Sequence, residues 1–131
     1  MFMKTWIFSF LTFVFTNVLF LSCHSDSDPA CLEVEILGPE QCTLGTIASV
    51  KSKKKIGNTV RYLDGKTYSN VIRIYSEVPV LSSSKAFVLL RDFDPKADEQ
   101  LANQYARICL AIYAPLPVPT KVATFWSESP C

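Results

Sequence analysis

Histidine is almost absent from this sequence, and its absence removes several kinds of chemistry. The only histidine is His24, so residues 31–131 contain none. Ser-His-Asp and Cys-His catalytic sites need a histidine beside the nucleophile, and histidine is also the commonest ligand of transition metals. We therefore expect neither a triad-type hydrolase nor a transition-metal site.

Glycine and net charge are also scarce. The four glycines are scattered, so the sequence holds no Gly-rich phosphate loop and we expect no cofactor of that kind. The chain has 13 basic and 12 acidic residues, and residues 1–22 hold one of the basic ones, Lys4. The rest of the chain is therefore balanced, without the overall field that attracts nucleic acid. We expect no nucleic-acid partner.

The N-terminal residues have the layout of a secretory signal peptide. Lys4 supplies a positive charge, and residues 6–21 are almost entirely apolar. A positive start, an apolar stretch and small residues before the cleavage site are typical of such signals. We predict that residues 1–22 are removed on export. A retained membrane anchor is an alternative, because the apolar run approaches the roughly 17–25 residues that span a bilayer.

The segment Phe20-Leu21-Ser22-Cys23 resembles the lipobox of bacterial lipoprotein precursors, in which an apolar stretch and a small residue precede a cysteine. Ser22 fits the small position, whereas Phe20 stands where the family usually has leucine. The resemblance covers residues 1–23 only. It implies that Cys23 becomes the acylated first residue of a lipoprotein. Two or more acyl chains on that residue would hold the protein stably in a lipid bilayer. Ordinary secretion without lipid is a further alternative.

Residues 23–30 are predicted to form a polar tether between the lipid and the domain. The tether resembles the acidic signals that direct some Bacteroidota lipoproteins to the cell surface, and a plain solvated spacer is the alternative. His24 stands where enteric bacteria have an inner-membrane retention aspartate. We expect a bacterial cell-envelope location, at the outer membrane or cell surface rather than the inner membrane.

Four cysteines remain after Cys23. They are Cys31, Cys42, Cys109 and Cys131. An even number in an exported chain predicts two disulfides, with three possible pairings. One pairing joins Cys31 to Cys131, which would tie the ends of the domain, and leaves Cys42 for Cys109. Zinc is a poorer interpretation, because no two of these cysteines have C-x-x-C spacing.

Residues 31–131 are predicted to form one β-rich domain. Alternating apolar and polar residues, β-branched residues and turn signals mark seven candidate strands. These cover residues 32–36, 43–50, 58–63, 67–75, 86–90, 108–112 and 121–126. Asp64-Gly65 predicts a hairpin turn, because both positions favour positive φ. The pattern is typical of a small β-barrel or sandwich, and an OB-like barrel is one form that fits.

One short helix is expected late in the chain. Asp94 and Pro95 suit the N-cap and the first helical position, and acidic residues follow in the first turn. The helical pattern ends near Ala106. The prolines between positions 115 and 119 predict an irregular connection to the last strand.

The densest charge run lies between two candidate strands. It consists of Lys51, Lys53, Lys54 and Lys55. A solvated hairpin loop is the simplest interpretation. The alternative is contact with lipid headgroups or lipopolysaccharide phosphates, because each lysine near an anionic surface contributes about 1 kcal/mol.

Three further groups of residues have simpler explanations than a site. Glu33 and Glu35 share one face of a strand, where we expect solvent rather than a catalytic cleft. The acidic residues between positions 92 and 99 offer oxygen atoms to Ca²⁺, but Lys96 and Ala97 break the EF-hand pattern and helix capping explains the acids. Five aromatic residues suit a glycan or peptide platform, but core packing is the expectation. These aromatic residues are Tyr68, Tyr75, Phe93, Tyr113 and Trp126.

The sequence thus favours a non-enzymatic envelope lipoprotein that acts as a binding or structural module. The expected partners are the lipid bilayer, through acylated Cys23, and an unknown envelope protein or glycan. The alternative is a periplasmic or surface enzyme of the hydrolase type that uses carboxylates only. An exposed apolar patch would favour binding, and a cleft with converging acids would favour chemistry.

Overall fold

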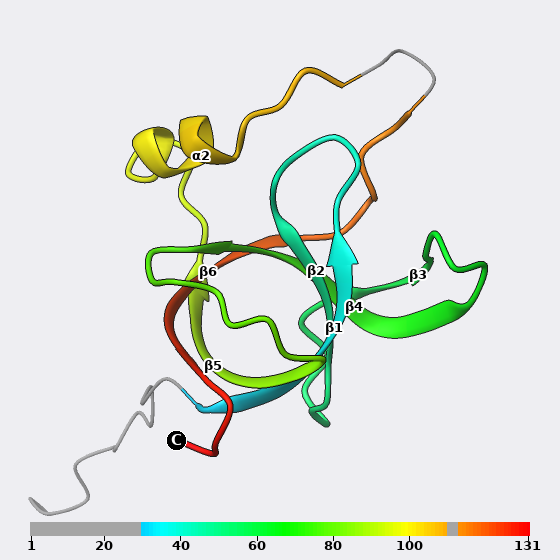
Figure 1. The fold of residues 1–131 in the computed structure, drawn as a ribbon, viewed down its shortest axis with the longest axis vertical. Coiled ribbons are helices and arrows are strands. Elements are labelled where there is room, and N and C mark those ends of the chain that lie inside the picture. The colour runs from blue at the N-terminus through cyan, green and yellow to red at the C-terminus, as the bar shows by residue number, and fades with distance from the viewer. Residues whose placement is uncertain (1–29, 110–112) are drawn as a thin grey trace, which may run out of the picture.

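The structure, a computed structural model, describes residues 30–109 and 113–131 (Figure 1). The predicted signal peptide and Cys23 lie outside these residues. Over these residues the chain is mainly β with one short late helix, which confirms the predicted fold class. Its elements are β1 (Leu32–Pro39), β2 (Thr46–Val50), β3 (Asn58–Arg61), β4 (Thr67–Ser76), β5 (Lys85–Asp92), α2 (Glu99–Tyr105) and β6 (Thr120–Ser127).

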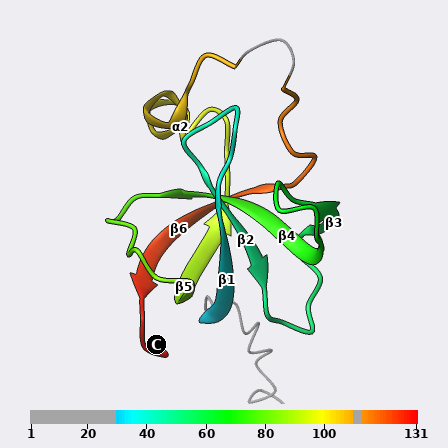
Figure 2. The ribbon, with the colours of Figure 1, turned by 45° about the vertical axis from the view of Figure 1, so that its right-hand side comes forward.

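Five of the strands close into a barrel. β1 pairs antiparallel with β2 and β5, β2 with β4, and β5 with β6, while β4 and β6 close the ring in parallel. Around the ring, the first barrel strand is followed by the second, third, fifth and fourth, which is the connectivity of an OB-like barrel. β3 lies outside the ring and extends β4 as a hairpin arm (Figure 2).

Small and β-branched side chains fill the barrel, because alternate residues of each strand point inward. On β4, Ile72 and Ile74 belong to this core, whereas Val71 faces outward. The buried core residues are Val34, Ala48, Val50, Ile72, Ile74, Ala86, Val88, Ala123 and Trp126. Ile56, Val78 and other half-buried side chains pack against this core.

The four cysteines form two disulfides, as the sequence predicts. Cys31 is bonded to Cys131, and Cys42 to Cys109. The first disulfide ties the start of β1 to the last residue of the chain, and the second joins the β1–β2 loop to the segment after α2. Such bonds form and persist in oxidising compartments, so they indicate an exported, non-reducing location.

The helix begins later than the sequence predicts. The Asp94 carboxylate accepts hydrogen bonds from the backbone N–H of Lys96 and Ala97, and the Asp94 carbonyl accepts from Asp98 N. These bonds close a separate turn, so α2 starts only at Glu99, after Asp98. The described residues contain no helix with the length and apolar composition needed to cross a bilayer.

Three predicted strands also need correction. The strand expected at 43–50 begins at Thr46, because the Thr43 hydroxyl bonds to Glu40 and to Gly45 N and bends the chain. The strand expected at 58–63 ends at Arg61, where the Asp64-Gly65 turn begins to form. The strand expected at 108–112 is absent at 108–109, where Cys109 is held by its disulfide, and its remainder lies outside the described residues.

Candidate functional site

Three connections meet at one end of the barrel, which we call the loop end. They are the β1–β2 loop (residues 40–45), the turn after β3 (residues 62–66) and the segment before β6 (residues 113–119). In Figures 1 and 2 the β1–β2 loop and α2 lie on the same side of the barrel. The start of β1 and the C-terminus lie on the opposite side.

A shallow hollow of about 40 Å³ lies between these connections. It is lined by Pro39, Glu40, Gln41, Tyr62, Leu63, Ala114 and Leu116. A cavity needs roughly 10–15 Å³ on this measure to hold one water, so the hollow has room for about three. Pockets for whole small molecules are far larger, about 300–1,000 Å³. The hollow therefore fits one group of a larger ligand, such as a single side chain, and not an entire cofactor.

Glu40 is the carboxylate of the hollow, and it is fully engaged. Its side chain is almost completely buried and forms a two-pronged ion pair with Arg73. It also accepts hydrogen bonds from the Thr43 hydroxyl, 2.6 Å away, and from Leu116 N, 3.0 Å away. Burial acts to raise the pKa of Glu40, but the hydrogen bonds and charge of Arg73, with the bonds from Thr43 and Leu116, lower it overall. Glu40 is thus an ionised structural group, unsuited to donating a proton.

Arg73 extends this ion pair to the other side of the loop end. Its guanidinium donates to the Leu116 carbonyl at 3.0 Å and to the Thr120 hydroxyl at 3.1 Å. Its backbone N–H donates to the Pro119 carbonyl. One arginine on β4 therefore fixes both the β1–β2 loop and the segment that leads into β6.

The β1–β2 loop is also fastened to α2. The Cys42–Cys109 disulfide joins the loop to the segment after the helix, and Leu44 N donates to the Tyr105 carbonyl at 3.0 Å. The Tyr105 ring stacks on Tyr75, and its hydroxyl exchanges hydrogen bonds with the backbone N–H and carbonyl of Ser76. Because α2 is bonded to β4 in this way, the loop end is a rigid frame.

Tyr62 forms one wall of the hollow. Its hydroxyl donates to the Pro39 carbonyl at 2.9 Å, and burial, followed by the negative charge of Asp64, raises the pKa of this phenol. Gly38 has φ of 141°, and a Cβ there would lie 2.5 Å from the Tyr62 oxygen. Position 38 therefore favours glycine for its conformation, and any other residue would also have to displace the Tyr62 hydroxyl.

Large apolar side chains are exposed around this frame. Leu44 and Leu63 are 56% and 57% exposed, and Tyr113 is 44% exposed. Ile108, which is 92% exposed, lies next to the Cys42–Cys109 disulfide. The three connections thus each contribute apolar surface to the same end of the barrel. Large apolar side chains that stay exposed on a folded domain can mark an interaction site when they lie together.

The outer face of β2 and β4 is covered by this chain itself. Many OB-like barrels bind ligands on the outer face of their second and third strands, which here are β2 and β4. Ile47 and Val71 on that face pack with Val60 of β3 and with Val118. Tyr62, Tyr68 and Leu116 lie against the same cluster. This face of the barrel is consequently not free to bind a ligand in the way that those barrels do.

The predicted lysine site lies at the other end of the barrel. Residues 51–57, which we call the lysine loop, connect β2 to β3. These two strands both pair with β4 and not with each other, so the connection is a loop but not the hairpin loop expected. Lys53, Lys54 and Lys55 are exposed, and Lys51 forms an ion pair with Glu35 at 2.6 Å. Glu33 and Glu35 share the outer face of β1, around the buried Val34, and so do not line the hollow.

Asn70 holds the lysine loop in one conformation. Its carboxamide oxygen accepts from Ile56 N and Gly57 N, both at 2.8 Å, and its amide nitrogen donates to the carbonyls of Val50 and Lys54. Asn70 is buried and has φ of 54°, a left-handed conformation that asparagine tolerates better than most residues. Hydrogen bonds to Asn70 therefore hold the backbone of the lysine loop in a defined conformation.

The acidic and aromatic candidates have structural roles. Within residues 30–109 and 113–131 no group of three or more potential ligands converges on a metal position. Asp98 binds Arg91 through both carboxylate oxygens. Tyr75 and Trp126 are buried, and Phe93 packs edge-on against Tyr75. Of the five aromatic candidates, Tyr113 keeps an exposed ring at the loop end.

The sequence analysis missed Glu40, Arg73 and Asn70. The sequence does mark Arg73, because its charge interrupts the apolar run Val71-Ile72-Arg73-Ile74. A charged side chain in such a strand is buried by its neighbours and therefore needs an oppositely charged partner. Asn70 also interrupts a strand pattern, which marks a bulge. Glu40 follows Gly38-Pro39 in a loop, and nothing in its local sequence distinguishes it from a solvated acid.

No protein-family model matches this sequence, and no curated protein is similar enough to it to indicate a relationship. The functional argument therefore rests on the geometry of the two ends of the barrel.

Proposed function

We propose that this protein is a non-enzymatic, lipid-anchored envelope protein whose loop end binds a partner molecule. The observation that carries the binding role is the exposed apolar rim of Leu44, Leu63 and Tyr113 on a frame fixed by Glu40–Arg73 and by a disulfide. Rigid presentation of apolar groups favours binding, because little conformational entropy is lost on association. The partner is an envelope protein or a glycan, one group of which enters the hollow beside Tyr62.

The anchor is supported by sequence and by the position of the chain ends. The lipobox-like segment ends at Cys23, and the two disulfides agree with an exported domain. The described chain begins at Ala30, at the end of the barrel opposite the loop end (Figure 1). An anchor at Cys23 therefore leaves the loop end free to meet a partner.

An enzyme that uses carboxylates is less well supported. Glycoside hydrolysis needs two opposed carboxyl groups about 5–10 Å apart, one of them able to donate a proton. The hollow is lined by one carboxylate, Glu40, which is ionised and bonded to Arg73. Turnover of glycoside or ester substrates that is abolished by Glu33→Gln or Glu35→Gln, in variants that keep the wild-type melting temperature, would favour the enzyme instead.

Site-specific photo-crosslinking tests the binding role. A photoreactive phenylalanine analogue replaces Leu44 or Leu63 in turn, and the cells that produce the protein are irradiated. The same analogue at Val80, which is 42% exposed on the β4–β5 connection, is the matched control. We expect one discrete adduct from positions 44 and 63 and none from position 80. Equal adducts from all three positions, or none, would count against a binding surface at the loop end.

Membrane fractionation with a labelled fatty acid tests the anchor. The wild-type chain should carry the label and sediment with membranes. Cys23→Ser should lose the label and either accumulate unprocessed or leave the membrane fraction. Label retained on the Ser variant would contradict lipidation of Cys23.

A further inference from the structure

We propose that the lysine loop is a docking surface that rests on anionic phospholipid headgroups and so turns the loop end away from the membrane. This inference rests on the proposed anchor at Cys23. It names what the lysine loop binds, and it gives the orientation of the domain relative to the membrane.

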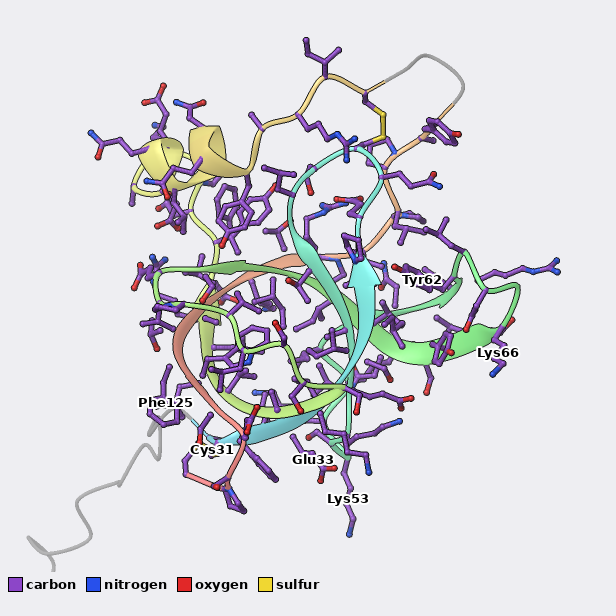
Figure 3. All side chains as sticks on the ribbon, viewed as in Figure 1. Cys31, Glu33, Lys53, Tyr62, Lys66 and Phe125 are labelled. Carbon is purple, nitrogen blue, oxygen red and sulfur yellow. A yellow bond between two sulfur atoms is a disulfide. The ribbon has the colours of Figure 1, made fainter. Side chains whose placement is uncertain are left out.

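The lysine loop starts beside the entry of the chain into the barrel. Val50, the last residue of β2, pairs with Val34, three positions after Cys31. The next residue, Lys51, donates its backbone N–H to the Glu33 carbonyl at 2.9 Å. Figure 3 shows Cys31, Glu33 and Lys53 at the same end of the molecule. The segment that leads back to Cys23 therefore leaves the barrel at the end that carries the lysines.

The length of that segment keeps the lysines near the bilayer. Residues 23–30 number eight, and an extended chain advances at most about 3.3–3.6 Å per residue. The barrel thus stays within about 30 Å of the acylated residue, and a relaxed tether brings it closer. Because electrostatic attraction is screened over about 10 Å at 0.1 M salt, a short tether is what makes a small lysine cluster effective.

The lysine loop presents its charges without ordering on contact. Asn70 bonds to three backbone groups of the loop and to the Val50 carbonyl just before it, and Ile56 packs against the barrel core. Gly57 lies so close to β4 that a Cβ there would be 2.3 Å from the Val71 carbonyl oxygen. Lys53, Lys54 and Lys55 are all exposed on this fixed backbone, and Figure 3 shows Lys53 projecting from the end of the barrel that carries Cys31.

One acid at this end of the barrel is offset locally, whereas Glu33, on the same face of β1, has no ion pair among the described residues. Glu35 forms an ion pair with Lys51 and lies opposite Lys85 in the β1–β5 register. Asp26 and Asp28 of the tether oppose the attraction to an anionic surface. The docking surface therefore works only if the side chains of the lysine loop reach the headgroup phosphates themselves, which makes the contact local and measurable.

Chemical labelling of lysine amines with an acylating reagent, on protein reconstituted in vesicles, tests this surface. The lipidated wild-type chain is placed in vesicles of equal parts phosphatidylglycerol and phosphatidylethanolamine, or of phosphatidylcholine alone. We expect the acylation rates of Lys53, Lys54 and Lys55 to fall severalfold in the anionic vesicles at low salt and to recover at high salt. Lys66 on the hairpin arm and Lys96 before α2 should react equally in both vesicles.

A triple variant separates docking from anchoring. In the wild type, Lys85 should share the protection in anionic vesicles, whereas Lys53→Gln with Lys54→Gln and Lys55→Gln should abolish it. Lys66→Gln with Lys96→Gln is the matched control and should leave Lys85 protected. The triple variant should keep its melting temperature, because the loop backbone is held by Asn70.

Each outcome distinguishes the two proposals. Equal acylation of the lysine loop in anionic and neutral vesicles, with the protein still bound to both, would overturn the docking surface and leave the anchor intact. Protection of Lys96 in place of the lysine loop would overturn the proposed orientation. Failure of the wild type to stay with either vesicle would overturn the anchor, and the docking surface with it.

Discussion

Glu40 and Arg73 lie 33 positions apart in the chain and meet in a two-pronged ion pair beneath the loop end. Both side chains are largely withdrawn from solvent. The pair joins the β1–β2 loop to β4 and, through Leu116, to the segment before β6. The shape of the proposed binding rim therefore depends on this buried ion pair.

Removal of one charge should destabilise the protein strongly. Breaking a buried ion pair by removing one partner typically costs about 3–5 kcal/mol, because the remaining charge is left without compensation. We expect Glu40→Gln to lower the free energy of unfolding by about 3 kcal/mol, measured by urea denaturation. Addition of Arg73→Met should restore part of this loss, since no unpaired charge then remains buried.

An exposed ion pair provides the comparison. Asp92 binds Lys121 on the surface, and the Asp92 side chain is 89% exposed. Pairs of this kind contribute little, because water screens them. Asp92→Asn should hence leave the denaturation midpoint almost unchanged. If Asp92→Asn lowered the free energy of unfolding as much as Glu40→Gln does, the buried ion pair would stabilise the protein no more than an exposed one.

Acid should destabilise the turn before α2 through Asp98. Hydrogen bonds from Arg91 and from Asp94 N, with the charge of Arg91, lower the pKa of Asp98 from 3.8 to about 2. A carboxyl whose pKa is lower in the folded state contributes stability above its unfolded pKa and loses it as the pH falls through the folded pKa. The contribution of Asp98 should thus be complete above about pH 4 and vanish near about pH 2.

Denaturation at a series of pH values measures this contribution. Asp98→Asn should be less stable than the wild type at neutral pH, and the difference should shrink between about pH 4 and about pH 2. A constant difference down to the lowest pH would show that the hydrogen-bond geometry of Asp98, and not its charge, stabilises the turn.

Local patterns in the sequence were sufficient for most of the strands. Strict alternation placed β1, with Val34 inward between two acids. Asp64-Gly65 marked the position of the β3–β4 turn, but only Gly65 has positive φ, 79°, and Gly65 N donates to the Tyr62 carbonyl, so the connection is longer than the two-residue turn expected. These features depend on neighbouring residues only. The helix start failed for a local reason as well, because the Asp94 side chain closes its own turn before α2 begins.

Contacts between distant residues were beyond a reading of the sequence. The parallel pairing of β4 with β6, the burial of Glu40 and the seating of the lysine loop on Asn70 each join segments that are far apart in the chain. The candidate binding site is built almost wholly from such contacts. The charge of the lysine loop was visible in the sequence, but its place beside the tether follows only from the β1–β2 register.

The two disulfides should differ in what they stabilise. Loss of either should cost about 2–4 kcal/mol, much of it through greater freedom of the unfolded chain. Replacing Cys42 and Cys109 by alanine should also speed hydrogen exchange in residues 40–45, which that bond fastens to the segment after α2. Replacing Cys31 and Cys131 should leave exchange in these residues unchanged.

Alkylation of protein taken directly from the envelope checks the starting state for that experiment. No free thiol should be found at any of the four positions, since both bonds are formed in the folded domain. A free thiol at Cys42 or Cys109 would show that the loop end exists in an open form.

Asn70 should be the most sensitive single residue behind the lysine loop. Its side chain accepts hydrogen bonds from the partly buried amide of Ile56 and the buried amide of Gly57, and an unsatisfied buried donor costs about 1–3 kcal/mol. We expect Asn70→Gly to lose about 2–4 kcal/mol while keeping the left-handed backbone, because glycine adopts positive φ freely. Asn70→Ala should lose roughly 1 kcal/mol more, since alanine is disfavoured at φ of 54°.

Asn58 supplies the matched control for this series. Its side chain makes one hydrogen bond, to the Pro117 carbonyl, from an exposed position on β3. Asn58→Ala should therefore cost only about 0.5–1 kcal/mol in the same urea titration. If the Ala and Gly variants at position 70 were equally stable, the left-handed conformation would not matter there. If both resembled Asn58→Ala, the lysine loop would not depend on Asn70, and its rigid presentation to a membrane would lose its physical basis.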